Sequence, residues 1–187
     1  MNHSVYKICI SALLSLFMMS VHAADIKAGK SRAAVCMGCH GSEGISTSPM
    51  WPNLAGQSRT YIEVQLKKFK AGQRSNSSMN AIAKDLSDAD IQNLAAYFSS
   101  LPSKSAGGDA KFAENGKGKA AMCTGCHGQE FKGNGQFPRL AGQHPKYLSK
   151  QLHDFKSGAR KGGPMNGIVQ SLSDDDIKAI AEYLGSL

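Results

Sequence analysis

The chain has 187 residues and a formal net charge of +8, with 7% aromatic residues and 20 glycines. This charge favours acidic partner surfaces and is too weak to indicate nucleic-acid binding. So little bulky side-chain material predicts that a large apolar group supplements the core.

The first 23 residues predict a secretory signal peptide. A short basic stretch ends at Lys7, an apolar run extends from Ile8 to Met19, and small residues precede a cleavage site after Ala23. The apolar run is about a dozen residues long, shorter than the roughly 20 needed to span a bilayer. We therefore expect export of a mature chain covering residues 24–187, with retention as an uncleaved anchor as the alternative.

The rest of the sequence is a duplication. The segment GKSRAAVCMGCHG, residues 29–41, returns as GKGKAAMCTGCHG at 116–128, and PNLAGQ at 52–57 returns as PRLAGQ at 138–143. Two copies of one unit predict two tandem domains, residues 24–101 and 109–187. Residues 102–108, PSKSAGG, are rich in helix breakers and predict a linker.

Helical periodicity is present in both copies. Apolar residues recur at spacings of four and three, as Ile62, Leu66 and Phe69 and as Leu148, Leu152 and Phe155. The last helix of each copy has a capping-box pattern, Ser87-x-x-Asp90 and Ser173-x-x-Asp176. Because no alternating pattern competes, we expect an all-α fold with three or four short helices per domain, joined by long loops.

The cysteines carry the chemistry. Cys9 leaves with the signal peptide, and the other four form two pairs, each followed directly by a histidine: Cys36, Cys39 and His40, and Cys123, Cys126 and His127. This C-x-x-C-H spacing is typical of covalent haem attachment, in which two thioethers hold the porphyrin and the histidine reaches the iron. A disulfide, a thioredoxin-like redox pair and a zinc site are the alternatives, but none of them requires the histidine. We therefore expect two covalently attached haem c groups.

Each iron needs a second ligand, which the duplication should place at equivalent positions. Met79 and Met165 satisfy this condition, and methionine ligation stabilises ferrous iron and raises the reduction potential. Other methionines and histidines lack an equivalent in the other copy. Met37 and Met122 are therefore expected to pack, and Met50, His144 and His153 are not expected to ligate.

Taken together, C-x-x-C-H, P-x-LAGQ, a late methionine and an LSDxDI helix resemble the cytochrome c4 family, dihaem class I cytochromes of the bacterial periplasm. The resemblance implies two class I cytochrome c folds with the haem propionate edges facing each other. It also implies that the Pro52 and Pro138 carbonyls accept a hydrogen bond from the other nitrogen of the histidine ligand. Candidate propionate contacts, with an ordinary polar surface as the alternative, are Gln57, Tyr61, Arg74, Gln143, Tyr147 and Arg160.

The resemblance further implies a periplasmic electron carrier, not an enzyme, working between a quinol:cytochrome c reductase and a terminal oxidase or other acceptor. Expected partners are redox proteins, with peripheral contact at membrane complexes and no nucleic acid. One alternative is the electron-transfer subunit of a redox enzyme such as a flavocytochrome sulfide dehydrogenase. The other is a dihaem peroxidase, which needs an open coordination position that methionine at both irons would close.

Overall fold

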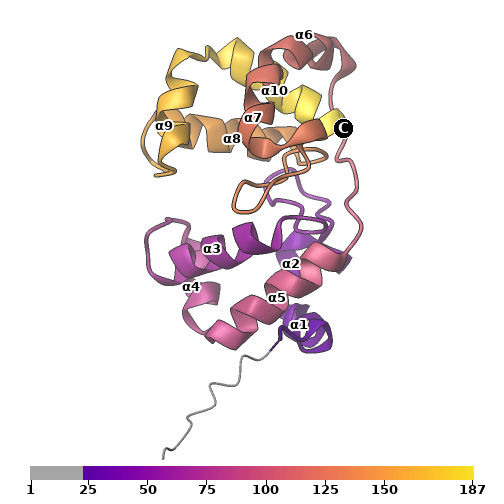
Figure 1. The fold of residues 1–187 in the computed structure, drawn as a ribbon, viewed down its shortest axis with the longest axis vertical. Helices are drawn as coiled ribbons and strands as arrows, with labels where there is room; N and C mark the ends of the chain where they lie inside the picture. Colours follow the sequence, from indigo (N-terminus) through magenta and orange to yellow (C-terminus); the bar gives the residue numbers. More distant parts are fainter. Residues whose placement is uncertain (1–22) are drawn as a thin grey trace, which may run out of the picture.

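The computed structural model describes residues 23–187, so the predicted signal peptide lies almost wholly outside the described residues. The described chain forms two helical lobes stacked along the long axis of the molecule (Figure 1). We call residues 23–101 the N-terminal lobe and residues 109–187 the C-terminal lobe. An extended segment between them runs along one side of the molecule, and the domain limits themselves stay a prediction.

The N-terminal lobe contains five α-helices and one 3-10 turn. They are α1 (Ile26–Arg32), α2 (Ala34–His40), η1 (Ser42–Gly44), α3 (Arg59–Lys70), α4 (Ser77–Lys84) and α5 (Asp88–Ser100). The predicted capping box opens α5, since the Ser87 side chain accepts from the Asp90 N–H and the Asp90 carboxylate accepts from the Ser87 N–H.

The C-terminal lobe repeats this order with more 3-10 turns. Its elements are α6 (Ala110–Ala120), η2 (Ala121–Cys123), α7 (Thr124–His127), η3 (Gln129–Phe131), α8 (Pro145–Lys156), α9 (Pro164–Ile168), η4 (Val169–Ser171) and α10 (Asp174–Ser186). Ser173 and Asp176 form the second capping box, at the start of α10. Among the described residues, β-structure is limited to one isolated bridge between Asn134 and Phe137, which confirms the all-α class.

Each lobe has more helices than the three or four expected. The cysteine motif forms a separate short helix after the first one, and the segment containing the late methionine forms another. Periodicity detects only helices long enough to show several apolar positions, so helices of one or two turns were missed.

The first and last helices of each lobe pack closely, α1 on α5 and α6 on α10. Gly29 lies against the backbone carbonyl of Asn93, and Gly116 lies against that of Ala179. A Cβ atom at either glycine would overlap the carbonyl oxygen, so these crossings require glycine. The crossings fix one wall of each core, which α3 and α8 complete through Ile62 and Leu148.

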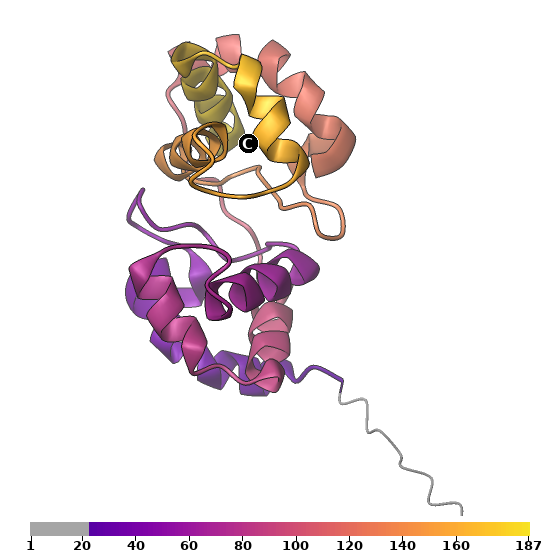
Figure 2. The same ribbon diagram turned by 90° about the vertical axis from the view of Figure 1, so that its left-hand side faces the viewer.

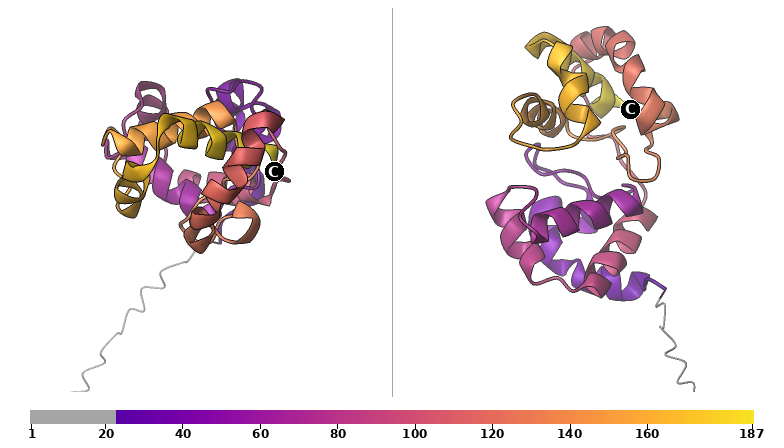
Figure 3. Two further views of the ribbon diagram at one scale, coloured as in Figure 1. Left: turned by 90° about the horizontal axis from the view of Figure 1, so that it is seen from above. Right: turned by 60° about the vertical axis from the view of Figure 1, so that its left-hand side comes forward.

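The lobes meet through the loops that precede α3 and α8, as two further views show (Figures 2 and 3). These loops follow the cysteine motifs, so the residues around the two motifs come close to the lobe interface. Within residues 23–187, no helix is long and apolar enough to cross a membrane.

Candidate functional site

The cysteine and histidine residues occupy equivalent places in the two lobes. Cys36 and Cys39 lie on α2 and His40 is its last residue, while Cys123 ends η2 and α7 contains Cys126 and His127. The glycine after each histidine has a positive φ, 76° at Gly41 and 78° at Gly128, and ends the helix. Residues three and four apart share a helix face, so the two thiols and the imidazole of each motif lie on one side.

The ionisation of the thiols bears on the alternatives to haem. Burial raises the pKa of the Cys36 thiol to about 11 and also raises that of Cys123. Zinc sites and reactive redox pairs use the thiolate, which such a pKa disfavours. A thioether carries no charge, so this environment suits covalent haem attachment better.

Both histidines are buried, each 6% exposed, and each is held by a backbone carbonyl. Nδ1 of His40 donates to the Pro52 carbonyl at 2.8 Å, and Nδ1 of His127 donates to the Pro138 carbonyl at 2.9 Å. These contacts confirm the two bonds that the family resemblance implied. Because a carbonyl only accepts, Nδ1 carries the proton and Nε2 keeps its lone pair.

Burial also lowers the pKa of His40 and His127, so both rings stay neutral near pH 7. A neutral imidazole with Nε2 deprotonated is the form that binds a metal ion. Both histidines therefore have the protonation state that iron ligation requires.

A hollow of about 960 Å³ runs between the two motifs and is lined by both lobes. All eight residues predicted to attach haem or ligate iron lie on its wall: Cys36, Cys39, His40, Met79, Cys123, Cys126, His127 and Met165. Most of the remaining lining is apolar and includes Phe69 and Phe98 in the N-terminal lobe and Leu152 and Phe155 in the C-terminal lobe. The hollow therefore has the size, the apolar walls and the donor atoms that haem groups need.

The unmatched methionines fall in different places. Met37 packs against the core of the N-terminal lobe, as expected. Met122 lines the hollow and is 58% exposed, so the expectation that it packs was wrong. Met50 also lines the hollow and is 47% exposed.

The two unmatched histidines lie outside the hollow's lining. His144 is buried between the lobes, and its Nε2 donates to the Ser46 carbonyl at 3.0 Å. Nδ1 of His153 lies 3.8 Å from a carboxylate oxygen of Asp174 on the surface. His144 is thus a contact between the lobes that sequence comparison missed, because Ser58 occupies its place in the first copy.

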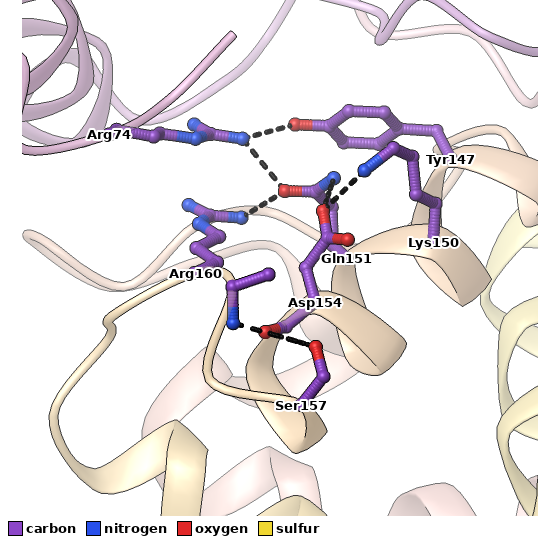
Figure 4. A network of polar contacts seen from close by, with 8 residues as sticks. Arg74, Tyr147, Lys150, Gln151, Asp154, Ser157 and Arg160 are labelled. Carbon is purple, nitrogen blue, oxygen red and sulfur yellow. Dashed lines mark hydrogen bonds and ion pairs between the residues drawn. The ribbon is translucent and has the colours of Figure 1, made fainter.

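Two arginines cross the interface in a reciprocal pattern, of which Figure 4 shows the half that Arg74 forms. Arg74 donates to the Tyr147 hydroxyl at 3.0 Å and to Gln151 Oε1 at 2.8 Å. Arg160 donates to the Tyr61 hydroxyl at 2.9 Å and to Gln65 Oε1 at 3.0 Å. We call this six-residue set the arginine clasp.

The clasp is positively charged and lines the hollow. Burial by itself raises the pKa of the Tyr61 hydroxyl, but the positive charges of Arg160 and Arg74 outweigh burial and hold that pKa below its usual value. A site that stabilises a phenolate in this way also suits carboxylates such as haem propionates. The clasp contains four of the six residues predicted to contact propionates: Tyr61, Arg74, Tyr147 and Arg160. Their contact with propionates stays a prediction.

Sequence comparison missed Gln65 and Gln151, although they occupy equivalent positions in the two copies. A systematic search for identical polar residues in both copies would have found them. Asn53 and Arg139, which also contact the other lobe, differ between the copies and leave no such signal.

Comparison with known proteins matches both lobes and the whole chain. The family model "Cytochrome c" matches residues 113–187, and "Cytochrome C oxidase, cbb3-type, subunit III" matches residues 24–98. Among curated proteins, a cytochrome c4 of Pseudomonas aeruginosa is 40% identical over 97% of this chain and 98% of its own length. A protein of Stutzerimonas stutzeri named "Thiosulfate dehydrogenase electron acceptor" is 34% identical over 92% of this chain and 90% of its own.

The fold agrees with these matches. The crystal structure of reduced recombinant cytochrome c4 from Pseudomonas stutzeri superposes with a TM-score of 0.82 at 37% identity, covering 88% of this chain and 100% of that one. Similarity therefore extends over both lobes, their arrangement and both motifs. On this evidence the chain belongs to the cytochrome c4 family of dihaem electron-transfer cytochromes, which carry two covalently bound haem c groups.

Proposed function

We propose that this chain is a periplasmic electron carrier that holds one haem in each lobe. Thioethers at Cys36 and Cys39, and at Cys123 and Cys126, attach the two groups. His40 with Met79 and His127 with Met165 ligate the irons. The observation that supports this assignment is that each lobe places a buried histidine, with Nε2 unprotonated, and the equivalent methionine on the wall of one hollow.

Haem iron, when bound, supplies one-electron exchange between the ferrous and ferric states. The residues of this chain prepare that exchange. The Pro52 and Pro138 carbonyls fix the ring orientation of the histidines and increase their basicity. Met79 and Met165 would hold the irons as second ligands and so leave no open position for water or oxidants, and the clasp arginines would offset the negative charge of propionates.

For the electron-transfer partners, we propose a quinol:cytochrome c reductase as donor and a terminal oxidase as acceptor. Methionine ligation favours a fairly positive potential, which suits a carrier late in a respiratory chain. Redox proteins with acidic docking surfaces fit the positive charge of the chain.

A second donor is favoured by one comparison, the 34% identity to a protein named as the electron acceptor of thiosulfate dehydrogenase. A sulfur-oxidising dehydrogenase would then reduce the same haems. Stopped-flow reduction by purified quinol:cytochrome c reductase and by thiosulfate dehydrogenase, at equal concentrations, separates the two donors. The physiological donor should reduce the protein at a rate that saturates with donor concentration.

Intact-mass measurement and redox-titrated optical spectra test the central assignment. The exported protein should weigh two haem groups more than residues 24–187, and its spectra should be those of low-spin iron. One haem, or an apoprotein with bridged cysteines, would contradict the assignment. Rapid consumption of peroxide by the native protein would instead place it among the dihaem peroxidases.

A further inference from the structure

Two glutamines cross the interface and each pairs with the backbone of one residue in the other lobe. Gln143 Oε1 accepts from the Asn53 N–H at 2.8 Å, and its Nε2 donates to the Asn53 carbonyl at 3.0 Å. Gln57 forms the same pair of bonds with Arg139, at 2.7 Å from the N–H and 2.9 Å to the carbonyl. Both glutamines are buried, at 7% and 6% exposure for Gln57 and Gln143.

The residues that are paired in this way directly follow the two prolines that bind the histidines. The Asn53 N–H and the Pro52 carbonyl belong to one peptide group, and so do the Arg139 N–H and the Pro138 carbonyl. In the N-terminal lobe, that peptide group therefore accepts from His40 at its oxygen and donates to Gln143 at its nitrogen. The C-terminal lobe has the equivalent hydrogen bonds: the Pro138 carbonyl accepts from His127, and the Arg139 N–H donates to Gln57.

A peptide group transmits such a contact because it is planar and conjugated. Holding the N–H fixes the direction of the carbonyl, since the two lie in one rigid plane. A hydrogen bond donated by the N–H also polarises the group and makes its oxygen a stronger acceptor. The histidine bonded to that oxygen becomes a more basic ligand, which stabilises ferric iron over ferrous iron.

We infer that Gln143 and Gln57 are positioning residues that act across the interface, so that each lobe fixes the histidine ligand of the other. Docking of the lobes and the potentials of both haems are then coupled through one peptide group on each side. This inference rests on the proposed ligation by His40 and His127. Its distinguishing feature is that the effect is crossed: Gln143 acts on the haem of the N-terminal lobe, and Gln57 on that of the C-terminal lobe.

The test uses the reduced holoprotein and two variants, Gln143→Leu and Gln57→Leu, which keep side-chain volume but remove both hydrogen bonds. NMR follows hydrogen exchange of the two histidine Nδ1–H groups and of the Asn53 and Arg139 N–H groups. In Gln143→Leu, exchange at His40 and Asn53 should accelerate about tenfold, while His127 stays unchanged. Gln57→Leu should give the opposite pattern, at His127 and Arg139.

Gln151→Leu is the matched control, because Gln151 bonds both clasp arginines at the same interface but neither peptide group. It should affect the two histidines alike. Redox titrations followed by NMR add a second readout: the haem in the lobe opposite the substituted glutamine should show the larger rise in midpoint potential.

Equal effects on both histidines in the Gln143 and Gln57 variants would overturn the inference and leave a purely structural interface role. If those variants do not fold into the holoprotein, hydrogen exchange of the same N–H groups in the wild type, measured at low urea concentrations, tests the coupling instead. The Asn53 and His40 groups should then exchange with the same dependence on urea, and so should Arg139 and His127; different slopes within a pair overturn the coupling. Failure of the proposed ligation has another signature, the absence of haem-shifted histidine Nδ1–H signals in the wild type.

Discussion

His40 and His127 show how one backbone carbonyl decides the chemistry of a side chain. The Pro52 and Pro138 carbonyls place the proton on Nδ1, and burial lowers the pKa of both rings. Each imidazole is thus neutral, oriented and unprotonated at the nitrogen that faces away from the carbonyl. The methionines lack such partners, and their assignment depends on the duplication and on their place in the hollow.

Replacement of Met165 by Ala tests the methionine assignment. The oxidised wild type should show the weak near-infrared band of methionine sulfur on ferric iron, at the intensity of two sites. The variant should lose half of it, because Met79, if it is the ligand we propose, would still hold the other iron. Met122→Ala, at a methionine of the same lobe that also lines the hollow, is the control and should keep the full band. An unchanged band in Met165→Ala contradicts the assignment.

Most residues of the candidate site could be named from sequence, because C-x-x-C-H has few chemical uses and the duplication selects two methionines that also line the hollow. The contacts between the lobes were not predictable in the same way. Gln143 pairs with Asn53 and His144 with Ser46, residues 90 and 98 positions apart that no periodicity connects. Such contacts depend on how the lobes dock, which the local sequence does not encode.

Among the helices, the crossings of α1 with α5 and of α6 with α10 depend on single glycines. The predicted capping boxes start α5 and α10 in register, so that Ile91 and Ile177 face the cores and are fully buried. Caps and periodicity therefore predicted α3, α5, α8 and α10, whereas α2, α4, α7 and α9 were too short to show a pattern.

Two glycines of α6 provide a matched test of the crossing. Gly116→Ala should lower the free energy of unfolding by about 1–3 kcal/mol, because the new Cβ overlaps the Ala179 carbonyl. Gly118→Ala, with nothing within 4 Å of its Cβ, should raise it by about 0.5–1 kcal/mol. Urea unfolding of the two holoproteins measures both values, and equal effects would show that helix propensity alone matters.

The capping box of α5 predicts a dependence on pH. Hydrogen bonds from Ser87 lower the pKa of Asp90, so this contribution to stability is complete above the unfolded pKa of about 3.9 and is lost as pH falls through the lower folded value. Ser87→Ala should cost about 1 kcal/mol at pH 7. The difference from wild type in urea unfolding should shrink at pH 3, and a difference that stays constant would exclude the contribution of Asp90.

At the scale of the whole molecule, the two lobes form one unit around a shared hollow. The arginine clasp and the glutamine pairs join them through buried and partly buried polar contacts, and removing one partner leaves the other without its hydrogen bond. The formal charge of +8 includes Lys7 in the predicted signal peptide, and haem propionates reduce it further. The mature holoprotein is therefore mildly positive, enough to steer partners at low salt.

Electron transfer from the reduced holoprotein to the proposed acceptor, a terminal oxidase, should consequently slow as salt rises. Screening limits steering to about 8 Å at physiological ionic strength, so we expect a roughly tenfold fall in rate between about 0.01 M and 0.5 M salt. Lys161 is exposed at the hollow, and Lys161→Gln should reduce this dependence. Lys111→Gln, at an exposed lysine of α6 outside that lining, should leave it nearly unchanged. Stopped-flow oxidation across a salt series measures the effect. Rates that do not vary with salt would show that charge does not steer the association of this protein with its acceptor.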